Sequence, residues 1–462
     1  QAASTTCTYD TITMLHVAAV ACLDIKNNFR RSMMKGYTGD MIRNVALLGH
    51  GGCGKTTFLE AALLATGVIN RLGRVEDGNT VSDYDKMEIE KGYSISDSIV
   101  PVEYNKVKIN FIDTPGFFDF IGEVNSAMRA VDAALILVDA SSGVQVGTEK
   151  AWNSCKQFNM PRIFVISKTD KENVDIDKTV AELQDKFGTS VITFNDTDAI
   201  VEAVAETDEE LMEKYFGGEA FTDEELKTGL LKGIASGDIA PVLVMSAVKG
   251  EGIKEALQAV IDYVPKASDH AAYKTVDGEE IAADPNGKPI GFVFKTIADP
   301  FLGKINLIKV VSGKLQPGME VYNARTEKAE KLGSLFFLRG KTQGDCPSAV
   351  TGDIVAAAKL QYTQTGDTLS DKASAVELLR MEFPQPSLFI AVQPKTKGDD
   401  EKVATGLHKL MEEDPSFVIE RNAEVKQLLL GGQGEIQLGI ITAKLKDKFG
   451  VEVQSIPQKI AY

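Results

Sequence analysis

Apolar and polar positions follow one pattern up to about residue 268 and other patterns after it. In the first part, short apolar runs alternate with stretches in which apolar residues recur at helical spacing. The runs are largely apolar, as strands buried on both faces of a parallel sheet are. This alternation predicts a doubly wound α/β domain over residues 41–268. The runs are IRNVALL, VKINFI, AALILVDA, RIFVIS and PVLVMS.

The later parts of the chain change period. Over residues 288–383, short β-rich runs such as GFVFKTIA and KINLIKVVSG recur between glycine turns, and this pattern predicts a β-barrel. Over residues 384–462, the order strand, helix, strand, strand, helix, strand predicts a ferredoxin-like α+β domain. The polar segment 269–287 contains Asp, Gly and Pro, and we interpret it as a linker.

Two other segments have their own patterns. Between residues 169 and 240 the sequence is acidic with helical period, which predicts surface helices of the first domain. We interpret residues 1–40 as a leader or extended N-terminus, because their basic residues follow the apolar stretch, which is the wrong order for a secretory signal. Met33 or Met34 would then be the natural initiator.

Composition narrows the class of protein without identifying it. The 462 residues are 44% hydrophobic and 25% charged, as in globular proteins, and no apolar run is long enough to cross a bilayer. The five cysteines are scattered and lack metal-binding spacing, which favours a reducing, cytoplasmic location. A net charge of −16 argues against a general nucleic-acid coat. We expect a monomer that binds neither membrane nor DNA.

A glycine-rich segment follows the first predicted strand. GHGGCGKT has glycines spaced for a tight loop, then a lysine and a hydroxyl residue, and it opens a helix. In such loops backbone N–H groups turn onto phosphates, the lysine reaches the β and γ oxygens, and the hydroxyl binds Mg²⁺. A plain turn is the alternative, and the strand–loop–helix context argues against it. The predicted nucleotide-binding residues are Gly49, His50, Gly51, Gly52, Cys53, Gly54, Lys55, Thr56 and Thr57.

The segment DTPG follows the strand VKINFI. Asp113 therefore lies at the carboxyl end of a strand, where open α/β sheets hold their ligand. A carboxylate there can hold Mg²⁺, usually through water, and the Gly116 N–H can meet a γ-phosphate. Alone, DTPG is only a turn. In register after a phosphate loop it indicates a nucleotide sensor.

Two more strand ends carry groups that suit guanine. In SKTD, the Asp170 carboxylate can accept two hydrogen bonds from guanine, whereas adenine lacks this donor pair. In SAV, a backbone N–H can meet the base. Each motif is weak alone, but their order at successive strand ends indicates GTP or GDP as the ligand. The residues are Ser167, Lys168, Asp170, Ser246 and Ala247.

Together these segments resemble the elongation factor G family of translational GTPases, which also includes tetracycline-resistance ribosomal protection proteins and release factor 3. DYDKMEIEKGYSIS, TGDTLSD and GGQGEIQLGII are further family-like segments. The resemblance implies a P-loop GTPase domain, a β-barrel domain and a ferredoxin-like domain. It also implies Mg²⁺ as a cofactor and the ribosome as a partner. The metal ligands would be Thr56, Ser94 and Asp113.

The resemblance also implies parts beyond this chain. In the family, the segment resembling PQKIAY leads into a fourth and a fifth domain, so we expect the end at Tyr462 to be a truncation. The stretch between residues 169 and 240 is shorter than in the main translocases, which favours a paralogous branch.

Three departures from the family pattern affect the nucleotide site. Gly52 stands where an acidic residue is associated with a helper monovalent cation. Ser94 replaces a threonine that binds Mg²⁺, and this change keeps a hydroxyl and a carbonyl. Ser167 replaces an asparagine whose amide braces the phosphate loop, so we expect weaker binding with guanine preference retained through Asp170.

The fourth departure is Phe117, where the family has a histidine that orients the attacking water. Phenylalanine has no hydrogen-bonding group, so it cannot position water, and we assign no catalytic residue. Lys55, Mg²⁺ and backbone amides can still stabilise charge in a slow reaction. FFDFIG can alternatively be an apolar switch packed on the sheet, which we favour for Phe118 and Phe120 and leave open for Phe117.

These observations predict a GTP-binding translation factor that acts on the ribosome in translocation with GTP hydrolysis. GTP would order the region from Gly73 to Ile99 and the segment DTPGFFDF. Two alternatives stay open. One is a ribosomal protection or recycling factor, and the other is a GTP-controlled ribosome-binding module with little intrinsic hydrolysis.

Overall fold

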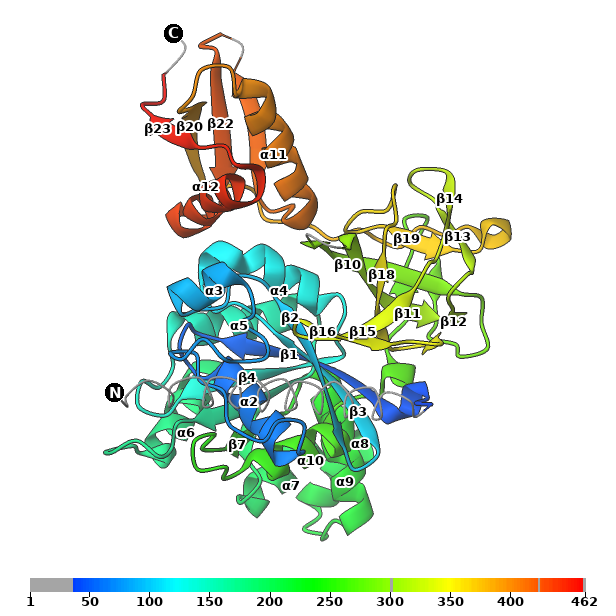
Figure 1. Ribbon diagram of the computed structural model, residues 1–462. Coiled ribbons are helices and arrows are strands. Elements are labelled where there is room, and N and C mark those ends of the chain that lie inside the picture. Colours follow the sequence, from blue (N-terminus) through cyan, green and yellow to red (C-terminus); the bar gives the residue numbers. More distant parts are fainter. Residues whose placement is uncertain (1–35, 300–301, 423, 460–462) are drawn as a thin grey trace, which may run out of the picture.

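Figure 1 shows a computed structural model of the chain, which describes residues 36–299, 302–422 and 424–459. The largest part is an α/β domain, a β-barrel lies at its side, and a smaller α+β domain lies at its upper end in this view. The predicted leader falls on residues 1–40, of which 1–35 lie outside the described residues, as does the predicted truncation point at Tyr462. No helix in the described part of the chain is long and apolar enough to cross a bilayer.

The α/β domain is built on one seven-stranded sheet. Strands β1, β3, β4, β5, β7 and β6 pair in parallel, and β2 pairs antiparallel with β3 at the edge. The five predicted strands are present, but the alternation did not reveal β2 or the three-residue β6. In sheet order the strands are β2 (Ser98–Tyr104), β3 (Val107–Asp113), β1 (Ile42–Gly49), β4 (Ala133–Asp139), β5 (Arg162–Ser167), β7 (Ala240–Val244) and β6 (Val191–Thr193).

Helices cover both faces of this sheet, as expected for a doubly wound domain. One apolar core lies under α2 (Lys55–Ala65) and α10 (Ile253–Tyr263), and the other under α4 (Ile121–Met128), α5 (Val146–Gln157) and α6 (Ile176–Phe187). The acidic stretch forms helices, as predicted. Besides α6 these are α7 (Thr197–Ala205), α8 (Glu209–Phe216) and α9 (Asp223–Ser236); the short α3 (Lys86–Lys91) precedes β2.

The second domain is an eight-stranded antiparallel sheet that wraps around one apolar core, which confirms the predicted barrel. The barrel also packs against the α/β domain through a second set of apolar side chains. Phe292 and Phe294 of the barrel belong to the same buried cluster as Ile136 of β4. The strands in sheet order are β14 (Lys328–Lys331), β13 (Glu320–Asn323), β19 (Thr368–Ser370), β10 (Ile290–Asp299), β11 (Gly303–Ser312), β18 (Ile354–Ala358), β15 (Leu335–Arg339) and β16 (Thr342–Asp345); β12 (Lys314–Leu315) pairs with β17 (Ala349–Val350).

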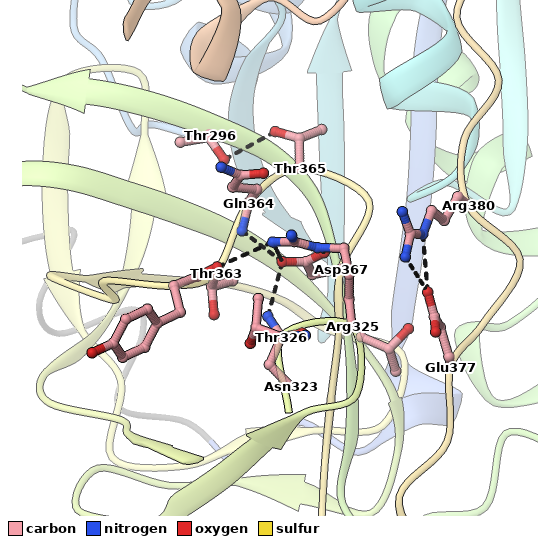
Figure 2. Close-up of polar contacts among 12 residues, drawn as sticks. Thr296, Asn323, Arg325, Thr326, Thr363, Gln364, Thr365, Asp367, Glu377 and Arg380 are labelled. Atoms are coloured by element: carbon pink, nitrogen blue, oxygen red, sulfur yellow. Dashed lines mark hydrogen bonds and ion pairs between the residues drawn. The ribbon is translucent and has the colours of Figure 1, made fainter. Parts of the chain in front are cut away.

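The TGDTLSD segment forms a polar cluster in the barrel, shown in Figure 2. Asp367 accepts hydrogen bonds from the Asn323 side chain at 2.8 Å, from the Gln364 N–H at 2.8 Å, and from the Arg325 guanidinium. Asp367 is 3% exposed, so these donors satisfy a carboxylate that is costly to bury alone. The segment therefore fixes the turn before β19.

The third domain has the sheet order β21-β22-β20-β23 with all pairs antiparallel, the arrangement of a ferredoxin-like fold. Two helices pack on one core with the sheet. The elements are β20 (Leu388–Pro394), α11 (Asp400–Glu413), β21 (Val418–Asn422), β22 (Gln427–Gly432), α12 (Glu435–Phe449) and β23 (Val453–Ile456).

The predicted linker has structure of its own. It contains a short hairpin of β8 (Tyr273–Lys274) and β9 (Glu280–Ile281), and Tyr273 is buried in the shared core of the first two domains. The polar composition of the segment did not predict this hairpin, because a single buried aromatic side chain gives no periodic signal.

Candidate nucleotide-binding site

The glycine-rich segment 49–56 forms a tight loop between β1 and α2, which we call the phosphate loop. Gly49, Gly52 and Gly54 have φ values of 136°, 79° and 99°, a region that favours glycine. At Gly49 a Cβ would also lie 2.5 Å from the Leu137 carbonyl oxygen. These glycines let the chain turn back and start α2 at Lys55.

The Lys55 ammonium lies inside this loop. It is 6% exposed, and its Nζ donates to the carbonyl oxygens of Gly49 at 3.0 Å and His50 at 3.1 Å. Burial first, and then the charge of Lys55, lower the pKa of His50. A positive group at the start of α2 is an arrangement that suits an anion.

The predicted metal ligands lie together beside the phosphate loop. The Asp113 Oδ2 accepts from Thr56 Oγ1 at 2.8 Å, and the Ser94 hydroxyl lies 3.5 Å from Thr56 Oγ1. Asp113 is 1% exposed, and burial, together with the charge of Asp83, raises its pKa to about 7. Such a carboxylate gains from a nearby cation.

Two residues in this cluster were missed from sequence. Ser82 Oγ donates to Asp113 Oδ2 at 2.8 Å, and the buried Asp83 contributes a second carboxylate close by. Oδ2 of Asp83 and Oδ1 of Asp113 have no hydrogen-bond partner in the described residues. Buried carboxylate and hydroxyl oxygens are donors that suit a hard cation such as Mg²⁺. The only signal was an acidic residue in the family-like segment DYDKMEIEKGYSIS.

The predicted guanine-recognition residues lie together at the ends of β5 and β7. Ser246 Oγ donates to Asp170 Oδ1 at 2.6 Å, which fixes the orientation of that carboxylate. Lys168 Nζ contacts the Gly52 carbonyl oxygen and Asp139 Oδ2, the latter at 2.9 Å, so it joins this region to the phosphate loop. Ala247 is buried immediately after Ser246.

Ser167 braces the phosphate loop in spite of the missing amide. Its hydroxyl donates to the Cys53 carbonyl oxygen at 2.6 Å and lies 3.1 Å from that of Val138. The asparagine amide is absent, but the serine hydroxyl contacts the loop in its place, and the expected weaker binding of nucleotide stays a prediction. A hydroxyl on the shorter serine side chain reaches the loop because β5 ends directly beside it.

The segment after Asp113 lies against the phosphate loop. A Cβ on Gly116 would lie 2.7 Å from Gly51 Cα and 2.7 Å from Lys55 Nζ, so only glycine fits there. Phe117 is 36% exposed, and its ring meets that of Tyr93, with centroids 4.6 Å apart.

The other two phenylalanines differ from the sheet-packed switch we favoured. Phe120 is buried in a small cluster with Met87, Ile95 and Ile440, away from the two sheet cores. Phe118 is half-buried between His50, at a centroid distance of 6.2 Å, and the Lys150 ammonium, which lies 3.8 Å from its ring centroid. The apolar pattern predicted burial but not the partners, which come from other segments.

Comparison with known proteins assigns the three domains. Family models match residues 40–266 (elongation factor Tu GTP binding domain), 288–372 (elongation factor G domain 2) and 383–456 (elongation factor G, domain III). A crystal structure of a protein from Thermus thermophilus is similar with a TM-score of 0.80 and 30% identity, over 91% of this chain and 68% of that one.

Fold, site and domain models define a GTP-binding translation factor, a GTPase. The chain belongs to the elongation factor G family of translational GTPases.

Proposed function

We propose that this protein binds the ribosome in a GTP-dependent manner and acts in translocation. The proposal rests on contacts that the barrel and the third domain make with the GTP-binding domain close to the nucleotide site. These contacts involve residues 96–97 and 119–123. From the barrel, Lys295 forms ion pairs with Asp97 and Glu123 and contacts Ser96 Oγ at 2.6 Å. From the third domain, α12 contacts Asp119. A change at the nucleotide therefore has a direct route to both domains.

The nucleotide would be held at three places. The phosphate loop and Lys55 would bind the β- and γ-phosphates, Asp170 would accept from guanine, and the Gly116 N–H would meet the γ-phosphate. The cluster of Thr56, Ser94 and Asp113, with Asp83, would hold Mg²⁺, which neutralises phosphate charge when bound. The bracing by Ser167 and the fixed Asp170 carboxylate support this assignment.

We further propose that the segments 73–99 and 113–120 are the switches of this GTPase. The first is anchored by Glu88, a buried carboxyl that accepts from the N–H groups of Ile95 at 3.0 Å and Ser96 at 3.1 Å. This segment reaches the candidate metal ligands through Ser94, whose hydroxyl lies 3.5 Å from Thr56 Oγ1. Loss of the γ-phosphate would release Ser94 from its contact with Thr56. The barrel and the third domain would then change their orientation relative to the GTP-binding domain.

Phe117 favours one alternative, a ribosome-binding module with a slow reaction. Its exposed ring provides no acceptor for the proton of an attacking water. Charge stabilisation by Lys55 and backbone amides would then provide most of the rate, with the ribosome supplying the rest.

Ribosome binding in defined nucleotide states tests the proposal. We expect the chain to bind ribosomes with a non-hydrolysable GTP analogue and to be released with GDP, while Lys55→Ala binds in neither state. Lys227→Ala, at an exposed position on α9 and outside both proposed switches, is the matched control. Equal binding with both nucleotides would contradict the proposal. Messenger RNA movement, tetracycline release and subunit splitting, measured with the complete protein, would separate translocation from protection and recycling.

A further inference from the structure

Helix α12 of the third domain lacks a cap of its own. It begins at Glu435, and the preceding Gly434 offers no side chain to its first N–H groups. Instead, Asp119 of the GTP-binding domain provides the acceptor. Its Oδ2 accepts from the N–H groups of Ile436 at 2.9 Å and Gln437 at 3.1 Å.

The Asp119 carboxylate takes the place of an ordinary helix cap. The two N–H groups are the second and third of the helix, the ones that an N-cap side chain normally satisfies. A negative charge there also interacts favourably with the helix dipole. A side chain from another domain therefore completes the start of α12.

Gly434 makes room for this contact. Its φ of −179° is extended backbone that any residue adopts, so its conformation does not require glycine. A Cβ there would lie 2.4 Å from Asp119 Oδ2, so a side chain at position 434 would require the Asp119 carboxylate to move away. Glycine at position 434 therefore both removes the local cap and leaves room for the Asp119 carboxylate to replace it.

The contact lies between the nucleotide site and the third domain. Asp119 belongs to the short 3-10 helix Phe118–Phe120, three residues after Gly116, which lies against the phosphate loop. Phe120 packs on Ile440 of α12, and Gly122 lies so close to Ser416 that a Cβ there would be 2.6 Å from Ser416 Cβ. Segment 116–122 therefore touches the phosphate loop at one end and the third domain at the other.

We propose that Asp119 is a positioning residue that caps α12 in the triphosphate state and withdraws from it in the diphosphate state. In the structure the Ser94 hydroxyl lies 3.5 Å from Thr56 Oγ1, and in this proposal we assign that arrangement to the triphosphate state. The inference rests on the proposed role of Gly116 as the γ-phosphate sensor. Movement of Gly116 after hydrolysis would pull Asp119 from α12 and free the third domain to reorient.

Amide hydrogen exchange at the start of α12 tests this coupling. We expect the N–H groups of Ile436 and Gln437 to exchange on the order of tenfold more slowly with a GTP analogue than with GDP, a change in the range of one helix cap. Asp119→Ala should abolish the difference. Asp119→Asn should keep most of it, because asparagine is also a good cap. Equal exchange of the unmodified protein in both states would overturn the inference.

A double variant separates coupling from helix stability. In Asp119→Ala/Gly434→Ser the freed space allows the new serine to cap α12 from within the third domain. We expect slow exchange in both nucleotide states and loss of nucleotide-dependent ribosome binding. If the double variant regains nucleotide-dependent binding, Asp119 has only a structural role and the inference is wrong.

Nucleotide affinity is measured in parallel with a fluorescent GTP and GDP. If neither nucleotide binds, both the proposed function and this inference fail. If both bind and the ribosome discriminates between the two states while α12 exchange does not, only the coupling through Asp119 fails.

Discussion

The rings of Tyr93 and Phe117 lie against each other with centroids 4.6 Å apart and planes tilted by 54°. The two rings come from the two proposed switches. They lie beside the phosphate loop, where a Cβ at Gly51 would be 3.7 Å from the Phe117 ring. In this pair only the Tyr93 hydroxyl can form a hydrogen bond through a side chain. An aromatic contact thus stands at the position where the resemblance to the family implies a water-orienting histidine.

Phe117→His should speed GTP hydrolysis on the ribosome. The imidazole would supply the missing acceptor, and general-base assistance is worth roughly 10²- to 10⁴-fold, of which we expect about tenfold or more. Single-turnover cleavage with saturating ribosomes measures it. Phe117→Leu is the control for loss of the ring, and an unchanged rate in Phe117→His would show that water is positioned by another group.

Ser167→Ala should weaken binding of GTP and GDP to a similar degree. The substitution removes the hydrogen bond to the Cys53 carbonyl, and a net loss of about 1 kcal/mol corresponds to roughly fivefold in affinity. Equilibrium titration with fluorescent nucleotides checks this. Ser142→Ala, at an exposed position, should leave both affinities unchanged. A selective loss for GTP alone would contradict the bracing role, since the loop serves both nucleotides.

The buried ion pair between Lys108 of β3 and Asp353 of the barrel should be sensitive to loss of one partner. Lys108 Nζ lies 2.7 Å from Asp353 Oδ1, and the side chains are 1% and 4% exposed. Asp353→Ala leaves a buried ammonium without its counter-charge, so we expect a loss of about 3–5 kcal/mol in the free energy of unfolding.

Urea unfolding followed by circular dichroism measures this loss. Lys108→Met/Asp353→Asn removes both charges and should recover much of it. Glu90→Ala breaks the exposed pair of Lys86 and Glu90 and should cost less than about 0.5 kcal/mol. Similar costs for the two single variants would show that the buried pair is not holding the domains together.

Glu88 should make the stability of the GTP-binding domain depend on pH. Burial first, and then the charge of Asp83, raise its pKa from 4.5 to about 8. Between these values the folded state keeps a proton that the unfolded state has lost, so stability falls as pH rises from about 4.5 to 8 and levels off outside this window. The slope is at most about 1.4 kcal/mol per pH unit.

Glu88→Gln should flatten this dependence, because the amide keeps the acceptor and cannot ionise. Unfolding followed by fluorescence of Trp152, the single tryptophan, reports on this domain at pH 5, 6, 7 and 8. Glu90→Gln, at an exposed position on the same helix, is the control. A parallel pH profile for Glu88→Gln and the unmodified protein would refute the prediction.

Most of the fold was predictable because its signals are local. Buried parallel strands such as β4 and β5 are continuous apolar runs, and the strand and helix order of the third domain is visible in sequence. Strand β6 was missed because three residues are too few to show a period, and the hairpin in segment 269–287 because its burial depends on one tyrosine.

The nucleotide site divides in the same way. Lys55, Asp113 and Asp170 each follow a strand at recognisable spacing, and the fold brings them to one edge of the sheet. Ser82 and Asp83 lie in a segment without hydrophobic periodicity, so the sequence did not predict their place in the site. The contact of Ser167 with Cys53 depends on the distance between two separate loops, which the sequence does not contain.

The sequence by itself determined the three folds and the guanine-nucleotide motifs, because these follow from residue type and spacing along the chain, and its resemblance to the family marked Phe117 as a departure. Only the tertiary structure decided what crosses between domains. Asp119 caps a helix of the third domain, Lys295 of the barrel forms an ion pair with Asp97, and Phe120 packs on Ile440. Such contacts join residues far apart in the chain, and their geometry is set by domain packing, which leaves no periodic trace in the sequence.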